Sequence, residues 1–383
     1  MKLRIGVLFG GASVEHEISI LSAMQAMDHL DPDRYEVIPI YVAKDHCFYQ
    51  DALLRDMKNF KDLDALITKL TPVTLYAKGN GAAVRKLTGL FNKEREVDLI
   101  FPIMHGTYGE DGSVQGYLRM LGIPFVGSDM AGALIGQDKV IMKQLLEGNG
   151  LPLVDWFALS RSDAQSETVL PQCEALGFPL IVKPANLGSS VGIQLVKNAE
   201  ELDDALQEAF LYDDHLVIER CLSELREYNC AVLGDECHMQ VSCVEEVLKG
   251  DAILSYRDKY EGNGKSKGMV SANRIIPASC SPQRQAEIEA LAQKCFSVLR
   301  GSGVARIDFL LDEATDQIYV NEINTIPGSL SFYLFEQKGL TFSRLLDELI
   351  NLAIERQRKQ SQMIYSYPSN VLSSYSSGMK MAK

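Results

Sequence analysis

Hydrophobic positions near the start of the chain predict a strand, a glycine turn and a helix. Residues 3–9 form a short apolar run that ends at Gly10 and Gly11. Apolar side chains then recur at helical spacing over residues 18–30, and a second apolar run follows at residues 35–42. A strand, a helix and a second strand in this order form a βαβ unit with a parallel sheet. We therefore expect a Rossmann-like first domain of the α/β class.

The remaining apolar runs predict shorter strands and helices in an α+β arrangement. Strands are expected at residues 97–103, 179–183, 191–196, 215–219, 227–233, 306–311 and 318–323, and helices at residues 129–146, 200–210 and 342–359. Residues 44–96 have a mixed pattern with a turn at residues 79–81. A Gly-Asn-Gly breaker at residues 148–150 marks the region where the first domain gives way to the next.

Length and composition exclude a small binding module and a disordered chain. With 383 residues, the chain exceeds what one hydrophobic core usually serves, so two or three lobes are expected. Hydrophobic residues make up 46% and charged residues 23%, as in ordinary globular proteins. Lys and Arg number 38 against 51 Asp and Glu, which leaves a net charge of −13. This charge repels nucleic acids and anionic membranes, so we expect neither as a partner.

The cysteines and the N-terminus indicate a cytoplasmic protein. The eight cysteines contain no C-x-x-C pair and no Cys/His spacing suited to structural zinc, which favours free thiols in a reducing compartment. The apolar stretch at the N-terminus is too short for a signal peptide, and no run of about 18 apolar residues follows.

One pair of expected strands gathers oxygen ligands on a single face. Period-two alternation places Arg306 and Asp308 on the same side of their strand. In the next strand, strict alternation groups Glu322 and Asn324 with Val320. If the two strands pair, three hard oxygen ligands lie beside an arginine, as Mg²⁺ with substrate phosphates requires. The alternative is a solvated sheet face with a surface ion pair.

Two glycine-rich loops offer ligand sites of opposite charge. Lys183 ends a buried strand and precedes the small, hydroxyl-rich segment 184–192, which could cradle phosphates. A plain hairpin turn is the alternative there. The first turn carries Glu15 and Glu17, which favour an ammonium ligand, although a Glu near a helix start also serves as a cap. The motifs G-x-G-x-x-G, Walker A and H-E-x-x-H do not occur.

Eight segments together resemble one family, the D-alanine:D-alanine ligases of the ATP-grasp superfamily. They are GGASVEHEIS (10–19), HGTYGEDGSVQGYL (105–118), IGQDK (135–139), KPANLGSSVG (183–192), REYNCAVLG (226–234), SYRDKY (255–260), GVARIDFLLD (303–312) and NEINTIPGSL (321–330). The segments follow the family's order and the similarity spans about residues 3 to 350. Eight ordered motifs favour the ligand sites over the structural alternatives given above for single loops.

The resemblance implies a fold of the α/β and α+β classes, with an N-terminal Rossmann-like parallel-sheet domain followed by a two-lobed ATP-grasp module. The implied segments are an N-terminal domain (1–138), a central lobe (139–222), a C-terminal lobe (223–357) with a closing loop (248–271), and a disordered tail (358–383).

The resemblance also assigns roles to individual residues. The implied catalytic residues are Glu15, Ser189, Tyr260, Arg306 and Gly328, and the substrate-binding residues are Glu15, His105, Ser189 and Ser331. The implied ATP-binding residues are Lys139, Lys183, Ser190, Glu219, Glu227 and Lys259, and the metal ligands are Asp308, Glu322 and Asn324.

By the same resemblance, the expected reaction joins two D-alanines for peptidoglycan synthesis. ATP and two Mg²⁺ ions, replaceable by Mn²⁺, convert the first D-alanine to an acyl phosphate, and the amine of the second attacks it. Arg306 and the Gly328 N–H would stabilise the oxyanion. A homodimer is expected.

Two departures from the family pattern affect the closing loop and the second substrate. Leu187 replaces an acid that helps to anchor the closing loop in some relatives, and the usual Thr/Ser-rich run after Gly328 is altered, so that Ser331 or Tyr333 could take its role. Tyr260 favours D-alanine over D-lactate as the second substrate. The alternatives are a ligase that takes D-lactate or D-serine, an ATP-grasp ligase for another carboxylate and amine, and a non-catalytic nucleotide-binding regulator.

Overall fold

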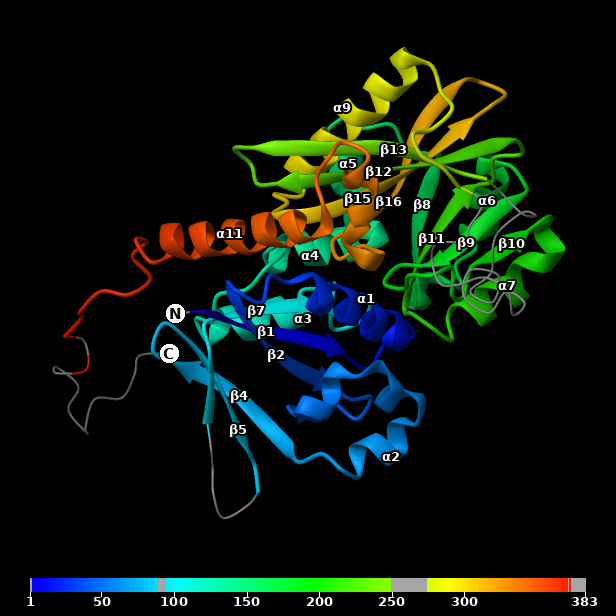
Figure 1. The fold of residues 1–383 in the computed structure, drawn as a ribbon. Helices are drawn as coiled ribbons and strands as arrows, with labels where there is room; N and C mark the ends of the chain where they lie inside the picture. The colour runs from blue at the N-terminus through cyan, green and yellow to red at the C-terminus, as the bar shows by residue number, and fades with distance from the viewer. Residues whose placement is uncertain (1, 89–93, 249–273, 371, 373–383) are drawn as a thin grey trace.

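The computed structural model describes residues 2–88, 94–248, 274–370 and 372, and this part of the chain contains three β-sheets (Figure 1). The first sheet has seven strands, the second four and the third five. The sheets follow one another along the chain, so each is built from a continuous portion of the sequence. The expected mixture of a sheet with parallel strands and further antiparallel sheets is confirmed.

The seven-stranded sheet contains the predicted βαβ unit. Its portion of the chain comprises β1 (Leu3–Gly10), α1 (His16–His29), β2 (Tyr35–Val42), β3 (Phe48–Tyr49), η1 (Ala52–Arg55), η2 (Met57–Lys61), α2 (Leu63–Ile67), β4 (Pro72–Lys78), β5 (Gly81–Lys86), β6 (Glu94–Val97), β7 (Leu99–Ile103) and α3 (Ser113–Met120). β1 pairs in parallel with β2 and β7, and β3 to β6 extend the sheet antiparallel. The predicted turn at residues 79–81 joins β4 to β5.

The apolar run at 97–103 forms two strands instead of one. Asp98 separates β6 from β7, and its carboxylate accepts hydrogen bonds from the main-chain N–H of Arg4 at 2.8 Å and from the Arg4 Nε at 3.0 Å. The Asp98 side chain thus binds the main-chain N–H of Arg4, at the point where the strand pairing is interrupted between β6 and β7.

The four-stranded sheet is antiparallel, in the order β10-β9-β11-β8. Its region comprises α4 (Met130–Gln137), α5 (Lys139–Gly148), β8 (Trp156–Ser160), η3 (Arg161–Asp163), α6 (Val169–Leu176), β9 (Leu180–Pro184), β10 (Gln194–Val196), η4 (Ala199–Glu201), α7 (Leu202–Ala209) and β11 (His215–Arg220). The strand expected at 191–196 begins only at Gln194. The preceding loop turns through left-handed backbone at Ser189, Ser190 and Gly192, which a strand cannot contain.

The single helix expected at residues 129–146 is wrong, because Asp138 divides it. α4 ends at Gln137, and the Asp138 carboxylate accepts from Val140 N at 2.9 Å and Ile141 N at 3.0 Å as the N-cap of α5. An Asp that caps one helix cannot lie inside a longer one, since its backbone is extended.

The five-stranded sheet is antiparallel, in the order β14-β13-β12-β15-β16. Its region comprises β12 (Leu225–Gly234), β13 (Met239–Val247), β14 (Arg274–Ile275), α9 (Pro282–Val298), β15 (Gly303–Asp312), β16 (Gln317–Asn324), η6 (Gly328–Ser331), α10 (Phe332–Glu336) and α11 (Phe342–Gln360). α9 packs its buried face, which includes Ile288 and Phe296, against this sheet.

The strict alternation expected in β16 is wrong, because this strand contains a β-bulge. Asp308 pairs with Glu322, but Phe309 pairs with Val320, so Asn321 is an extra residue. Val320 therefore lies in the core instead of sharing a face with Glu322. The bulge is invisible to a period-two pattern because a single residue reverses the face of all those before it.

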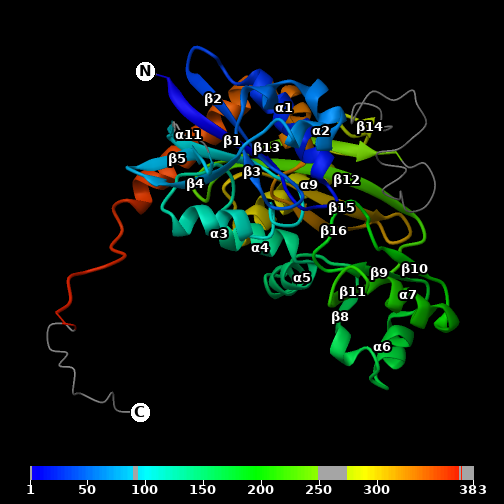
Figure 2. The ribbon, with the colours of Figure 1, turned by 90° about the horizontal axis from the view of Figure 1, so that it is seen from below.

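The first and third sheets share one core, and α11 lies between them (Figure 1). That core joins Val7 and Phe9 of β1 to Leu345 and Leu349 of α11. In both views the four-stranded sheet lies to the side of the five-stranded sheet (Figures 1 and 2). The site described below is at the junction of all three.

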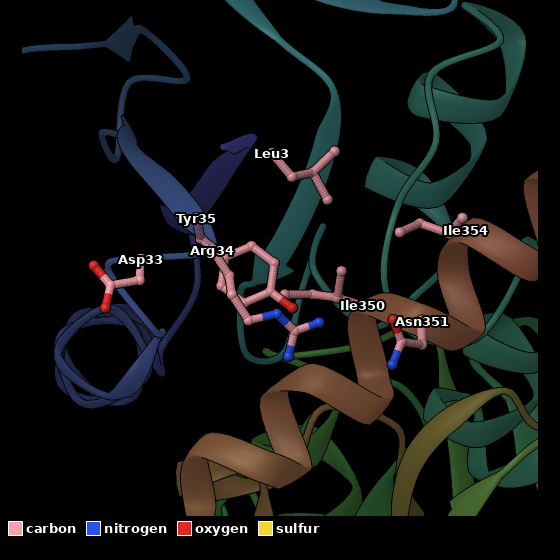
Figure 3. Close-up of a pocket in the computed structure, with 7 residues that line it drawn as sticks. All are labelled: Leu3, Asp33, Arg34, Tyr35, Ile350, Asn351 and Ile354. Carbon is pink, nitrogen blue, oxygen red and sulfur yellow. The ribbon is translucent and has the colours of Figure 1, made fainter. Parts of the chain in front are cut away.

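A cavity of about 380 Å³ opens where β1 and β2 begin, against α11 (Figure 3). Leu3, Arg34, Tyr35 and Ile350 are among its lining residues. None of the candidate site residues lines it, and it lies at the opposite end of β1 from Gly10. Within the described ranges, no helix is both long and apolar enough to cross a membrane.

Candidate active site

Three hydrogen bonds join the three sheets at one junction. Ser189 donates to Glu15, Lys183 Nζ donates to Asn321 Oδ1 at 3.0 Å, and the Ile326 N–H donates to Glu110 Oε1 at 2.6 Å. The first bond connects the turn after β1 with the loop after β9, the second connects β9 with β16, and the third connects the loop after β7 with the loop after β16. Most of the candidate residues lie around these three contacts.

Strand register brings the expected oxygen ligands into one row. Asn229, Asp308 and Glu322 pair directly across β12, β15 and β16, and directly opposed residues share a face. In the neighbouring row, Arg306 pairs with Asn324. The predicted shared face for the three metal-ligand candidates is therefore present in the structure.

Asp308 accepts three hydrogen bonds from two neighbours on this face. Arg306 Nε donates to its Oδ1 at 2.6 Å, Arg306 Nη2 to its Oδ2 at 2.7 Å, and Asn324 Nδ2 to its Oδ2 at 3.1 Å. Burial raises the pKa of Asp308 to about 6, Arg306 opposes that rise, and Glu322 adds to it. The alternative of a solvated face does not hold, because Asp308 is only 2% exposed.

The residues on this face fit a divalent cation. The charge of Glu322 raises the pKa of Asp308, and a metal ion that neutralises both carboxylates would remove this repulsion. Carboxylate and amide oxygens are ligands that Mg²⁺ prefers. Among the described residues, no three His, Cys, Asp or Glu side chains form a complete metal cluster. A metal ion held by Asp308 and Glu322 would need Asn324 and oxygens of a bound phosphate to complete its coordination.

Three buried lysines surround one glutamate beside this face. Lys183 Nζ and Lys143 Nζ each lie 2.6 Å from a carboxylate oxygen of Glu219. Lys139 Nζ donates to the Leu187 carbonyl at 2.6 Å. Burial would raise the pKa of Glu219, but the two lysines outweigh it and hold the pKa at about 2. Burial lowers the pKa of Lys139 and Lys143, and nearby carboxylates oppose that shift. A bound phosphate would oppose it as well, so three lysines with one glutamate suit phosphates.

Lys143 was not expected from the sequence. It is 1% exposed, and its ammonium lies 5.7 Å from the centre of the Trp156 ring. Lys139 and Lys143 are four residues apart and therefore share one face of α5. That spacing is the signal that could have identified it.

The loop after β9 connects two paired antiparallel strands and contacts Glu15. Ser189 and Ser190 have φ of 55° and 59°, and a Cβ at Gly188 would lie 3.0 Å from Glu15 Oε2. The loop therefore contacts Glu15, the residue that is expected to bind the first substrate. Glu15 occupies the N-cap position of α1 but makes no side-chain cap bond, so ordinary capping does not explain it.

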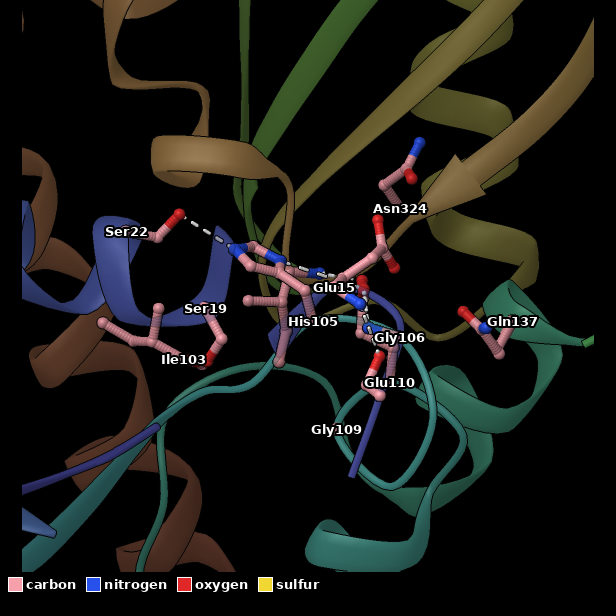
Figure 4. Close-up of polar contacts among 12 residues, drawn as sticks. Glu15, Ser19, Ser22, Ile103, His105, Gly106, Gly109, Glu110, Gln137 and Asn324 are labelled. Atoms are coloured by element: carbon pink, nitrogen blue, oxygen red, sulfur yellow. Dashed lines mark hydrogen bonds and ion pairs between the residues drawn. The ribbon is translucent and has the colours of Figure 1, made fainter. Parts of the chain in front are cut away.

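His105 and Glu110 lie beneath Glu15 on the loop that follows β7 (Figure 4). His105 Nε2 is 2.9 Å from Ser22 Oγ on α1, and burial lowers the pKa of the ring to about 4. His105 is therefore neutral at pH 7. Glu110 was not expected as a site residue, although it lies inside one of the family motifs.

The turn after β16 adds an unusual stretch of backbone. Ser329, Leu330 and Ser331 all have φ near 50°, in the left-handed region that costs free energy for residues other than glycine. Ser331 is fully buried, and its hydroxyl has no hydrogen-bond partner in the part of the chain that the structure describes. Gly328 begins this turn. Nearby, the Tyr333 hydroxyl lies 3.4 Å from Glu245 Oε2.

The remaining candidates divide into one placed residue and two outside the described ranges. Glu227 lies two residues from Asn229 on β12, so it shares the face of Asp308, whose pKa its charge raises. Lys259 and Tyr260 lie outside the described residues.

Comparisons with known proteins agree with this geometry. Family models match residues 4–128 as "D-ala D-ala ligase N-terminus" and residues 145–351 as "D-ala D-ala ligase C-terminus". A D-alanine--D-alanine ligase of Thermosipho melanesiensis is 38% identical over 371 residues, covering 97% of this chain and 98% of the relative. One from Caldicellulosiruptor bescii is 38% identical over 375 residues, covering 95% and 99%.

Solved structures show the same relationship. The D-alanine-D-alanine ligase of Coxiella burnetii superposes with a TM-score of 0.79 at 31% identity, covering 94% of this chain and 96% of that one. The VanG D-Ala:D-Ser ligase of Enterococcus faecalis superposes with a TM-score of 0.77 at 29% identity, covering 92% and 100%. The matched motifs, the junction of three sheets and these similarities over nearly the full length lead to one conclusion: the chain belongs to the D-alanine–D-alanine ligase family.

Proposed function

We propose that the chain is an ADP-forming ligase that joins two D-alanines through an acyl phosphate, for peptidoglycan synthesis in the cytoplasm. The observation that carries this proposal is the meeting of a carboxylate-rich strand face with a cluster of buried lysines, directly beside Glu15. Such a site neutralises and positions phosphates, which is most of what carboxyl-to-phosphoryl transfer requires. No protein nucleophile is needed.

The first D-alanine binds where two sheets meet. Its ammonium faces Glu15, with Ser189 and the neutral His105 beside it. A carboxylate oxygen of this substrate attacks the γ-phosphorus of ATP, the bond from that phosphorus to the β–γ bridging oxygen breaks, and ADP leaves. Lys139 and Lys183, with the loop at Ser190, hold the phosphates during this transfer.

Metal ions supply charge neutralisation when they are bound. Asp308, Glu322 and Asn324 would hold two Mg²⁺ ions, which Mn²⁺ can replace, against the ATP phosphates. On the nucleotide side, Glu219 and Glu227 would approach the adenine and ribose, although Glu219 also has to keep its lysine partners.

The second D-alanine enters beside the turn after β16. Its neutral amine attacks the acyl carbonyl, and the oxyanion that forms receives hydrogen bonds from Arg306 and the Gly328 N–H. The bond from carbon to the phosphate oxygen then breaks, and phosphate leaves with the proton that the amine loses. The hydroxyl of buried Ser331, which has no hydrogen-bond partner among the described residues, is the favoured contact for the second substrate, with Tyr333 next to it. Lys259 and Tyr260 would act in the closing loop.

The test is release of phosphate from ATP with a panel of D-amino and D-hydroxy acids, with products identified by mass spectrometry. We expect D-alanyl-D-alanine as the main product. The same measurement on Asp308→Asn should give a folded protein with almost no turnover, because a negative ligand is lost. Near wild-type phosphate release from that folded variant would contradict the site.

The strongest alternative is a ligase that takes D-serine as the second substrate. The VanG structure, named a D-Ala:D-Ser ligase, has a similarity close to that of the Coxiella burnetii enzyme. The panel separates the two, because D-alanyl-D-serine would then exceed D-alanyl-D-alanine at equal substrate concentrations.

A further inference from the structure

Glu110 is a buried carboxylate that binds main-chain groups in two loops, which follow strands of two different sheets. Its Oε2 accepts from the Gly106 N–H at 3.0 Å, and its Oε1 accepts from the Ile326 N–H at 2.6 Å. The side chain belongs to the loop between β7 and α3 and is 6% exposed. Burying a glutamate costs free energy unless its oxygens are hydrogen-bonded, as both are here.

Each of the two N–H groups belongs to a different part of the active site. Gly106 lies against the first-substrate residue, because a Cβ there would lie 2.7 Å from Glu15 Oε2. Ile326 lies two residues after Asn324 and two before Gly328, between a metal-ligand candidate and the oxyanion donor. One carboxylate therefore fixes the first-substrate loop relative to the turn that carries Gly328.

A second set of contacts runs parallel to the first without replacing it. Ser22 Oγ on α1 contacts His105 Nε2 at 2.9 Å and accepts from the Ser329 N–H at 3.1 Å. This link holds α1 to the same turn, but it does not involve Gly106. His105 also hydrogen-bonds to the main chain of Ile326. The Gly106 N–H itself is joined to that turn through Glu110.

We propose that Glu110 is a positioning residue of the ligase, which holds the first substrate at the right distance from the oxyanion donor. This inference rests on the function proposed above. It requires both carboxylate oxygens, since one accepts from Gly106 in the loop after β7 and the other from Ile326 in the loop after β16. Glutamine offers only one acceptor oxygen and turns an NH₂ group toward the other N–H, and aspartate is shorter by about 1.5 Å.

The charge of Glu110 predicts a pH dependence of activity that a purely structural role would not produce. The charged and titratable groups that face it are Glu15 on the turn before α1, His105 on its own loop and Arg306 on β15. Burial, with a further contribution from Glu15, raises the pKa of Glu110 to about 8. The ionised form, with two full acceptors, therefore becomes dominant as the pH rises through this value.

The experiment compares Glu110→Gln and Glu110→Asp with Asp111→Asn. Asp111 is a matched control, because it accepts from Tyr108 N at 2.8 Å and Ser113 N at 2.9 Å within the same loop. For each protein, kcat, the KM of each D-alanine, the KM of ATP, the melting temperature and the pH profile are measured. We expect both Glu110 variants to lose roughly 10- to 100-fold in kcat, as small displacements at a reacting centre do.

The pattern of constants distinguishes positioning from general damage. We expect the KM of the first D-alanine to rise while the KM of ATP stays unchanged, and the rise of wild-type activity near pH 8 to be absent from Glu110→Gln. Ionisation of the acceptor amine is common to both proteins and cancels in this comparison. Asp111→Asn should keep the wild-type kcat and pH profile.

Three results would overturn the inference. They are wild-type kcat in both Glu110 variants, equal losses in Asp111→Asn, and a KM of ATP that rises in step with that of D-alanine. If Glu110→Gln does not fold, Glu110→Asp decides. A wild-type protein that forms no dipeptide would instead contradict the proposed function, so the two failures are distinguishable.

Discussion

His105 is a histidine whose surroundings keep it neutral. Burial first, and then the charge of Arg306, lower its pKa to about 4, whereas the ring of an unfolded chain titrates near 6.5. Below 6.5 the unfolded state binds the proton more readily than the folded state, so the free energy of unfolding falls as the pH drops from about 6.5 to 4.

We predict that His105→Gln loses less stability on acidification than the wild type. At pH 5 the difference should be about 2 kcal/mol, from the separation of the two pKa values. Urea unfolding of both proteins at pH 7 and pH 5 measures it. Equal losses in the two proteins would show that His105 is not the group that titrates.

Glu219 is the residue on which the lysine cluster depends. Glu219→Gln leaves Lys143 and Lys183 buried without a carboxylate between them, which should cost about 3 to 5 kcal/mol. Lys143→Met should cost less, because Lys183 still pairs with Glu219. The free energies of unfolding from urea titration rank the variants, and the reverse order would contradict this account of the cluster.

At the residue scale, the sequence reveals chemistry where a regular pattern carries it. Alternation correctly places Arg306 and Asp308 on one face. It misses Asn321, because the bulge that turns this residue toward Lys183 depends on pairing with another strand. It misses Glu110 because its partner, Ile326, is more than two hundred positions away along the chain.

At the scale of elements, Asp138 controls the position of Lys139. Its carboxylate caps α5, and the Lys139 N–H donates to the Ala185 carbonyl at 3.0 Å, so the start of the helix is attached to β9 and its loop. We predict that Asp138→Ala lowers the free energy of unfolding by about 1 kcal/mol and raises the KM of ATP. Asp138→Asn, which retains a capping oxygen, should keep both values close to the wild type. An unchanged KM in the alanine variant would contradict the link to Lys139.

The predicted elements agree with the structure where hydrophobic periodicity is strong. The strand at 35–42 and the helix from residue 342 are found within a residue or two. Within residues 44–96, β3, η1, η2 and α2 have five residues or fewer, which is too few to show a period. β4 and β5 are longer, with seven and six residues, and only the turn between them was predicted. Asp138 and Asp98 were overlooked because each divides an apolar run by bonding to main-chain groups.

For the whole molecule, Arg356 near the end of α11 attaches this helix to the first domain. The guanidinium of Arg356 donates to the carbonyls of Phe125 and Gly127 and lies 4.5 Å from the centre of the Phe125 ring. Beyond Gln360, the side chains of Met363, Ile364 and Tyr365 are exposed.

We predict that a chain ending at residue 360 keeps the melting temperature and activity of the full chain. A chain ending at residue 355 lacks Arg356 and should melt several degrees lower. Calorimetry of the two truncations and the full chain tests this. A lower melting temperature for the chain ending at residue 360 would mean that the segment after α11 also packs on the body.

The core that β1 shares with α11 has a consequence for how the protein is made. A ribosome releases β1 at the beginning of synthesis and α11 only near its end, yet Val7 and Phe9 share one core with Leu345 and Leu349. The first domain therefore cannot mature while the chain is still growing. A nascent chain stalled before α11 leaves this hydrophobic surface exposed. Premature termination should therefore give an aggregation-prone fragment that chaperones retain, and not a folded domain.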